Sequence, residues 1–318
     1  MVGRKLAEVL LADGTLRGEP VTGLMLADVT APEAPGSDTV EITTHEVDIA
    51  DPRFSEQLIA PRPDVIFHLA AIVSGQAEQD FDLGYAINMD GTRHLFEAIR
   101  AAGQAERYCP RVVYTSSQAV FGAPFPKQIG DEFFTTPLTS YGAQKAIGEL
   151  LLADYSRRKF LDGVGIRLPT ISIRPGKPNL AASGFFSSIL REPLAGKEAV
   201  LPVDEDVRHF HVSPRKAVRF LRHGAEIDTA PMGVRRNLNM PGLSATVGEQ
   251  IDGLRRIAGE DAVALIRKEP DPEIAKIVKG WPTDFDASRA LALGFEPETS
   301  FDDIIQAHIE DEMGGTHT

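Results

Sequence analysis

The segments PRVVYTSSQAVFG, residues 110–122, and SYGAQKAIGELLLADYSRRK, residues 140–159, decide the fold of this chain. The first is rich in β-branched and aromatic residues, which favours a strand. It does not alternate polar with apolar positions, so we expect a strand buried on both faces, as in a parallel sheet. The second has the spacing of a long amphipathic helix. Together they predict a buried strand followed by a helix that covers the sheet.

The same alternation continues on both sides of these segments. Apolar runs with strand composition lie at 21–29, 40–48, 63–71 and 163–176, and helical spacing is seen at 1–14 and 88–103. Because strands alternate with helices, we predict an α/β fold with a doubly wound parallel sheet.

After Arg174 the alternation loosens. Helices are predicted at 185–196 and 214–227, short strands at 198–203 and 207–212, and capping boxes at Thr246 with Glu249 and at Ser300 with Asp303. We therefore predict a main domain over residues 1–173. Residues 174–318 are predicted to form a smaller α/β substrate domain, some segments of which return to the main domain.

The composition excludes several classes of protein. The net charge of −13 disfavours nucleic acid as a partner. Cys109 is the only cysteine, which excludes an internal disulfide and argues against a structural zinc site. No apolar stretch has the length of a membrane span, and no signal peptide is recognisable. We expect a cytoplasmic protein that contacts neither membrane nor nucleic acid and holds no metal.

Three residues have a spacing that suggests chemistry. Tyr141 and Lys145 are four residues apart on one helix, so both side chains lie on the same face, and Ser117 ends the preceding strand. A phenol ionises near pH 10 and acts as a base at neutral pH only if a nearby cation stabilises its phenolate. Lys145 is placed to do so. Ser117 would hydrogen-bond the substrate oxygen whose proton Tyr141 removes.

The motifs HLAA, NMDGT, VVYTSSQAVFG, SYGAQK and IRPG follow one another in an order that resembles the extended short-chain dehydrogenases/reductases. This resemblance covers about the first 180 residues and implies a Rossmann fold that binds NAD. It also implies that Ser117, Tyr141 and Lys145 are the catalytic group, with Lys145 and Tyr141 contacting the cofactor. Helices 88–103 and 141–159 would pair in a homodimer. Asn88 matches the family's helix-bending asparagine, although a plain helix N-cap is an alternative.

The resemblance also assigns residues to the cofactor. Asp28 would accept the hydroxyls of the adenosine ribose and disfavour a 2′-phosphate, so NAD is preferred to NADP; a solvated aspartate at a strand end is the alternative. Asp48 and Ile49 would contact adenine, and Leu69, Ala70 and Ala71 would line the cofactor.

Gly3 matches the third glycine of the family's phosphate-binding fingerprint, although a helix-packing glycine is the alternative. This match implies that the first strand and the first two glycines are missing from the sequence. We therefore expect the functional protein to carry about ten more residues ahead of Met1.

Four residues are substrate candidates: Ser74, Arg174, Asn179 and Arg208, in addition to Ser117. An arginine fork binds a carboxylate bidentately, but either arginine also fits a surface ion pair. His209 and His211 suggest a metal, but two ligands do not make a site, and the structural interpretation is preferred.

Ser117 is followed by Gln118 and Ala119 rather than by a second acid, which favours simple hydride transfer. Longer stretches, such as IRLPTISIRPGKPN and WPTDFDASRALALGF, resemble a branch of the family that oxidises the 2-hydroxyl of four-carbon sugar acids. We therefore expect an NAD-dependent dehydrogenase with a small anionic sugar acid as substrate. A sugar-nucleotide epimerase is the alternative enzyme, and a non-catalytic NAD-sensing regulator is an alternative of another class.

Overall fold

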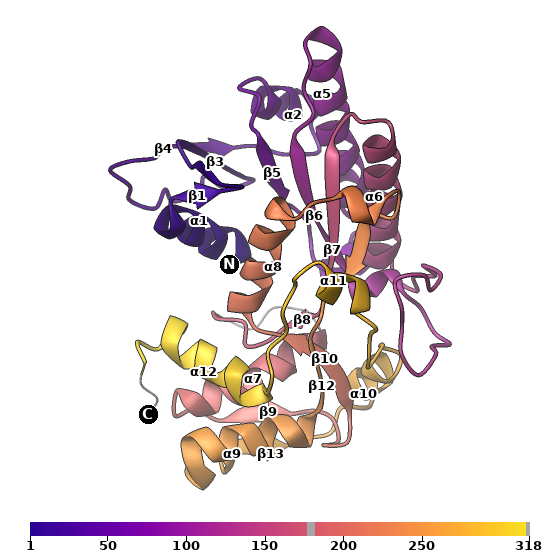
Figure 1. The fold of residues 1–318 in the computed structure, drawn as a ribbon. Helices are drawn as coiled ribbons and strands as arrows, with labels where there is room; N and C mark the ends of the chain where they lie inside the picture. The colour runs from indigo at the N-terminus through magenta and orange to yellow at the C-terminus, as the bar shows by residue number, and fades with distance from the viewer. Residues whose placement is uncertain (177–181, 316–318) are drawn as a thin grey trace. The chain divides into compact units, whose positions relative to one another are not determined.

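A computed structural model describes residues 1–176 and 182–315 of the chain (Figure 1). The chain forms two compact units. Unit 1 contains residues 1–120, 139–167 and 218–238, and unit 2 contains residues 121–138, 168–217 and 239–318. The predicted boundary at 173/174 stays a prediction. Unit 1 is Rossmann-like, and unit 2 is a smaller mixed α/β assembly. No helix in the described ranges has the length and apolarity needed to cross a membrane.

The main sheet of unit 1 has four strands in the order β11-β7-β6-β5. Strands β5 and β6 are parallel, with Val65 opposite Arg111 and His68 opposite Tyr114. The side chains of Val112, Val113 and Tyr114 are fully buried, as the continuous apolar run predicted. The bounds of the strands are β5 Val65–His68, β6 Arg111–Ser117, β7 Asp162–Leu168 and β11 Asn237–Asn239.

Helices cover both faces of this sheet. A Cβ added at Gly148 of α6 (Ser140–Arg157) would overlap the ring of Tyr114, whereas one added at Gly224 of α8 (Pro214–Glu226) would approach Val113 and Ile166. Because neighbouring residues of a strand point to opposite faces, Val113 and Tyr114 place the two helices on opposite sides. The sheet is therefore wound on both faces, as predicted.

A second, two-stranded parallel sheet is formed by β3 (Gly23–Asp28) and β4 (Glu41–Glu46). It is not hydrogen-bonded to the four-stranded sheet among the described strands, and residues Leu24 to Leu26 of β3 are only half-buried. Three further elements belong to this part of unit 1: helix α1 (Val2–Asp13), a hairpin of β1 (Thr15–Leu16) and β2 (Glu19–Pro20), and helix α2 (Pro52–Ile59). Helix α1 is capped at its C-terminus by Gly14, whose left-handed φ of 64° allows its N–H to donate to the carbonyl of Leu10.

The connection from β5 to β6 is helical throughout most of its length. It contains α3 (Ser74–Gln79), α4 (Phe81–Gly84), the π-helical segment η1 (Tyr85–Gly91) and α5 (Thr92–Ala105). Leu95, Phe96 and Ile99 of α5 join Tyr114 and Leu152 in one apolar cluster. This cluster fixes α5 and α6 against the sheet.

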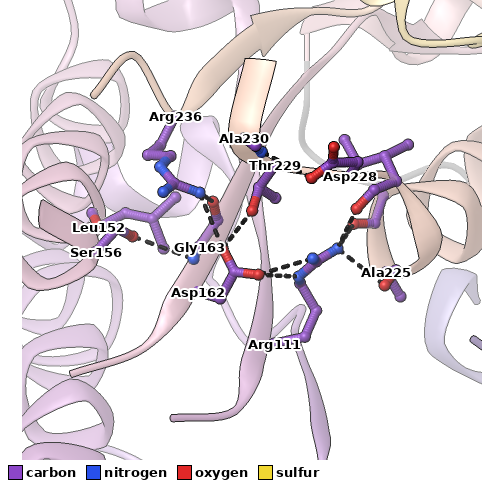
Figure 2. Close-up of polar contacts among 12 residues, drawn as sticks. Arg111, Leu152, Ser156, Asp162, Gly163, Ala225, Asp228, Thr229, Ala230 and Arg236 are labelled. Carbon is purple, nitrogen blue, oxygen red and sulfur yellow. Dashed lines mark hydrogen bonds and ion pairs between the residues drawn. The ribbon is translucent and has the colours of Figure 1, made fainter. Parts of the chain in front are cut away.

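The buried side chain of Arg111 joins residues 218–238, which follow a long segment of unit 2 in the chain, to the sheet of unit 1 (Figure 2). One terminal nitrogen of Arg111 donates to the carbonyls of Gly224, Ala225 and Ile227 at distances of 3.1, 2.9 and 3.1 Å. Its other nitrogens donate to Asp162 at 3.1 and 2.7 Å. A cation suits this place because carbonyls at the end of a helix carry partial negative charge. The contact anchors the last turn of α8 on β6 and β7.

Unit 2 contains a three-stranded sheet in the order β12-β10-β8 and a two-stranded parallel sheet of β9 and β13. Strand β10 is antiparallel to β12 and parallel to β8. The strands are β8 Thr170–Ile171, β9 Ala199–Leu201, β10 Arg208–Val212, β12 Leu243–Thr246 and β13 Ile266–Lys268.

The helices of unit 2 bury one apolar cluster that includes Phe186, Leu190, Leu254, Ile304 and Ile305. The predicted capping boxes of α9 and α12 are confirmed, since each serine or threonine and its acidic partner exchange hydrogen bonds. The longer helices are α7 Phe185–Leu194, α9 Val247–Val263, α10 Pro272–Lys279, α11 Ser288–Ala292 and α12 Phe301–Glu312. Short helical turns are η2 Gln118–Val120, η3 Ala182–Gly184 and η4 Ala230–Met232.

Candidate active site

Ser117 is the last residue of β6, at the carboxyl end of the strand. The chain turns there into η2, and the N–H of Ala119 donates to the Ser117 hydroxyl at 3.1 Å. This contact fixes the serine side chain at the carboxyl end of β6. Carboxyl ends of strands are the usual place for a ligand in open α/β sheets.

Tyr141 and Lys145 lie in the first two turns of α6. The helix is capped by Thr139, whose hydroxyl accepts from the N–H of Gly142 at 3.1 Å. Ser117 lies close enough to the Tyr141 phenol to lower its pKa. The ammonium group of Lys145 lies 5.9 Å from the centre of the Tyr141 ring and donates to the carbonyl of Thr115 at 2.8 Å. The three predicted catalytic residues therefore come together at the end of β6.

Burial dominates the electrostatics of this group. It raises the pKa of the Tyr141 phenol to about 12, and the effect of Ser117 offsets only part of this increase. Burial lowers the pKa of Lys145 to about 8, and the charge of Glu149 acts in the opposite direction. We expected the lysine charge to make the phenol more acidic. In the structure Ser117, and not Lys145, is the group that lowers the pKa of Tyr141.

The predicted cofactor residues lie at the carboxyl ends of strands. Asp28 ends β3, and its exposed carboxylate accepts from the N–H of Val29 at 2.7 Å. Asp48 follows β4 and accepts from the N–H of Ala50 at 2.9 Å. Both carboxylates retain acceptor positions that suit sugar or base donors.

The remaining cofactor candidates lie in α1 and in the segments that follow β4 and β5. A Cβ added at Gly3 would lie 3.5 Å from Leu69, which is an ordinary contact, so packing alone does not require glycine there. Ala70 and Ala71 are exposed after β5. Ile49 packs closely on Gly91, where a Cβ would come within 2.7 Å of it.

The residues present fit an NAD molecule by the chemistry of their groups. Asp28 offers an exposed acceptor for ribose hydroxyls, Lys145 offers a cationic donor, and Leu69 with the two alanines offers a mostly apolar lining.

Asn88 is buried inside the π-helical segment and is not a helix N-cap. Its amide exchanges hydrogen bonds with the backbone of Ile72, at 2.9 and 3.2 Å, and donates to the Gln144 side chain at 2.7 Å. The helix-bending interpretation therefore fits the structure. Asn88 therefore ties the loop after β5, which leads to Ser74 at the start of α3, to Gln144 of α6.

Arg174 of unit 2 is half-buried and donates to the hydroxyl of Ser183 at 2.9 Å. Burial, together with the nearby charge of Arg191, lowers the pKa of Arg174. Arg191 in turn donates to the Arg174 carbonyl at 2.7 Å. Within the part of the chain that the structure describes, no carboxylate pairs with the Arg174 guanidinium. It is therefore suited to receive an anion.

Arg208 is already engaged. It donates to the carbonyl of Ser244 at 2.8 Å and lies 3.3 Å from Glu249, the acid of the α9 capping box. Asn179 lies outside the described residues.

Both histidines of β10 are hydrogen-bonded to other side chains of the protein. His209 contacts the Thr170 hydroxyl at 2.6 Å, and His211 contacts Ser172 and Gln250 at 3.1 Å each. Among residues 1–176 and 182–315, no three His, Cys, Asp or Glu side chains form a cluster suited to a metal ion.

A buried acid that the sequence analysis did not single out lies beside the candidate catalytic residues. Glu149 accepts from the Ser116 hydroxyl at 2.6 Å and from two nitrogens of Arg167 at 2.8 and 2.7 Å. Its position four residues after Lys145 was the available signal, because this spacing puts both on one helix face.

Comparison with known proteins shows the family of the chain. Residues 1–213 match the NAD dependent epimerase/dehydratase family. The chain belongs to this family. NAD is the cofactor that membership implies, in agreement with the prediction.

Three relatives are informative. The chain is 47% identical to D-erythronate dehydrogenase of Cupriavidus necator over 98% of its own length and 95% of that protein. It is 42% identical to D-erythronate dehydrogenase of Haemophilus influenzae over 98% of its length and 96% of that protein. A crystal structure described as a nucleoside-diphosphate-sugar epimerase from Agrobacterium tumefaciens is 64% identical, with a TM-score of 0.97, and the match covers 99% of this chain and 92% of that one.

Proposed function

We propose that this protein is an NAD-dependent dehydrogenase that oxidises the 2-hydroxyl of D-erythronate to the corresponding 2-keto acid. The observation that carries the proposal is its identity of 47% and 42%, over nearly the full length, to two proteins named D-erythronate dehydrogenase. The absence of an acid at positions 118 and 119 agrees with hydride transfer alone.

In the proposed reaction the substrate O–H bond and the C2–H bond both break. Ser117 hydrogen-bonds the substrate oxygen, and Tyr141 takes its proton. NAD, when bound, supplies the acceptor for the hydride that leaves C2, so one alcohol is oxidised and one nicotinamide is reduced. With a pKa of about 12, Tyr141 is almost wholly protonated at neutral pH in the structure. In the structure Ser117 is the group that lowers this pKa, and we assign the further stabilisation of the phenolate during the reaction to the charged Lys145 on the same helix face.

We assign the substrate carboxylate to Arg174 in preference to Arg208. Arg174 pairs with no described carboxylate, whereas Arg208 is paired with Glu249. Ser74 and Asn179 remain further candidates for substrate contacts. We also propose a cytoplasmic homodimer built on helices 88–103 and 141–159, which light scattering after size-exclusion chromatography checks.

The test is NADH formation from D-erythronate. Tyr141→Phe should lower kcat at least about a hundredfold, since a positioned acid or base contributes 10² to 10⁴. Tyr155→Phe, on the same helix but bonded to Glu97 of α5, is the matched control and should keep its activity within about twofold. Equal turnover by wild type and Tyr141→Phe would reject the assignment.

A sugar-nucleotide epimerase is the second candidate, favoured by the description of the Agrobacterium tumefaciens structure. The two functions differ in the size of the substrate, since an epimerase must hold a diphosphate. Competition by UDP against D-erythronate, together with epimerisation of a UDP-sugar, would favour the epimerase. Turnover of C4 acids that is indifferent to UDP would favour the dehydrogenase.

A further inference from the structure

Helix α6 presents three ionisable side chains in one row. Tyr141, Lys145 and Glu149 are each four residues apart, so they lie on one face of the helix. Lys145 and Glu149 are 2% and 3% exposed. Two of the three belong to the proposed catalytic group, and the third is buried without a role in the reaction described above.

The buried carboxylate of Glu149 accepts three hydrogen bonds from two side chains. Arg167 of β7 grips both carboxylate oxygens through Nε and a terminal nitrogen, at 2.8 and 2.7 Å, and Ser116 donates at 2.6 Å. The side chains of Arg167 and Glu149 are 6% and 4% exposed. Buried ion pairs of this kind are costly to form, so they often serve specificity rather than stability. The place of this pair, next to the serine and lysine of the site, points to such a use.

We propose that Glu149, clamped by Arg167 and Ser116, is a positioning residue that keeps the Lys145 side chain charged and directed at the end of β6. The proposal rests on the proposed function, because it assigns a purpose to the charge of Lys145. Glu149 touches neither substrate nor cofactor in this scheme. It acts through the lysine and through Ser116, the neighbour of Ser117.

The surroundings of Lys145 make its charge depend on Glu149. Lys145 faces the rings of Tyr141 on its own helix and of Tyr114 on β6, the latter at 5.0 Å. It also acts on His68 of β5, whose pKa burial and the lysine charge lower to about 3, so that this imidazole is neutral. Glu149 is therefore the anion that favours the ammonium form, against a burial effect that disfavours it.

Two single variants separate this role from a merely structural one, because they predict opposite effects. In Glu149→Gln, Arg167 remains charged at any usable pH and repels the ammonium, so the pKa of Lys145 should fall by about 1 unit or more. In Arg167→Gln, the carboxylate of Glu149 loses its competing cation, so the pKa of Lys145 should rise. The double variant Glu149→Gln with Arg167→Gln removes both charges and should return the pKa toward that of the wild type.

The measurement is direct titration of Lys145 by NMR of ¹⁵N- and ¹³C-labelled lysine side chains, without cofactor or substrate. Lys145→Arg identifies the resonance by its loss. In parallel, the pH dependence of kcat on D-erythronate should show its alkaline limb moved down in Glu149→Gln and up in Arg167→Gln. Circular dichroism confirms folding. If Glu149→Gln does not fold, the Arg167→Gln and double variants still decide the question.

The outcomes distinguish the two proposals. Opposite shifts of Lys145 in the two single variants support the inference, even if no C4 acid is turned over, in which case the proposed function alone fails. Shifts of the same sign, or none, overturn the inference, and turnover of D-erythronate in that case leaves the proposed function standing.

Discussion

Replacing Arg111 with methionine should remove about 4 kcal/mol from the stability of unit 1. Methionine keeps the length of the side chain but removes the charge and every donor. Removing one partner of a buried ion pair costs about 3–5 kcal/mol. The lower value applies because Asp162 is 28% exposed and keeps its bonds from Thr229 at 2.7 Å and Arg236 at 2.9 Å. The three carbonyls at the end of α8 lose their donor, which adds about 1 kcal/mol.

A loss of this size is large against a typical total stability of about 5–15 kcal/mol. Urea unfolding followed by far-ultraviolet circular dichroism measures it, and hydrogen exchange in residues 218–238 localises it. Arg157→Met is the matched control, since Arg157 and Asp154 are 57% and 58% exposed and their pair should contribute less than about 0.5 kcal/mol. A loss below about 1 kcal/mol for Arg111→Met, or protection in 218–238 equal to wild type, would refute the reasoning.

Two further predictions concern stability. Burial lowers the pKa of His209 to about 3. Between about pH 6 and 4 the imidazole therefore binds a proton in the unfolded chain but not in the folded one. As the pH falls through this range, the free energy of unfolding of unit 2 should decrease by at least about 1 kcal/mol per pH unit. Fluorescence of Trp281, whose ring lies 5.2 Å from His209, reports this, and an equally steep loss in His209→Gln would contradict it. Gly148→Ala should destabilise by about 1–3 kcal/mol because its Cβ would overlap the Tyr114 hydroxyl. Gly130→Ala, which meets nothing within 4 Å, should leave Tm nearly unchanged in calorimetry, and equal effects of the two would argue against the overlap.

Much of the fold was visible in the sequence because strands buried on both faces leave continuous apolar runs. The runs at 63–71 and 110–122 contain β5 and β6, and the helical spacing at 1–14 contains α1. The partners of Arg111 could not be predicted. Besides Asp162, they are backbone carbonyls 113 to 116 residues away, and a carbonyl acceptor has no residue type that marks it.

The sequence predicted those residues of the candidate site that lie in short motifs, but not the partners that come from distant parts of the chain. Ser117, Tyr141 and Lys145 come together as expected, but the clamp on Glu149 comes from Arg167 on a separate strand and has no local spacing to reveal it. The π-helical segment around Asn88 was also hidden, since one extra residue in a turn does not change the composition of a helix. Arg174 and Arg208 could not be ranked, because Glu249, the acid that pairs with Arg208 of β10, lies far along the chain in α9.

The return of residues 218–238 to unit 1 has a consequence for how the protein is made. A ribosome delivers the chain from its N-terminus, and domains generally fold as their residues emerge. Here the nascent sheet receives its last strand, β11, and the guanidinium of Arg111 meets its carbonyls, only after residues 168–217 of unit 2 have been synthesised. Until then β7 is an edge strand of a three-stranded sheet, and completion of the sheet depends on translation reaching residues 218–238.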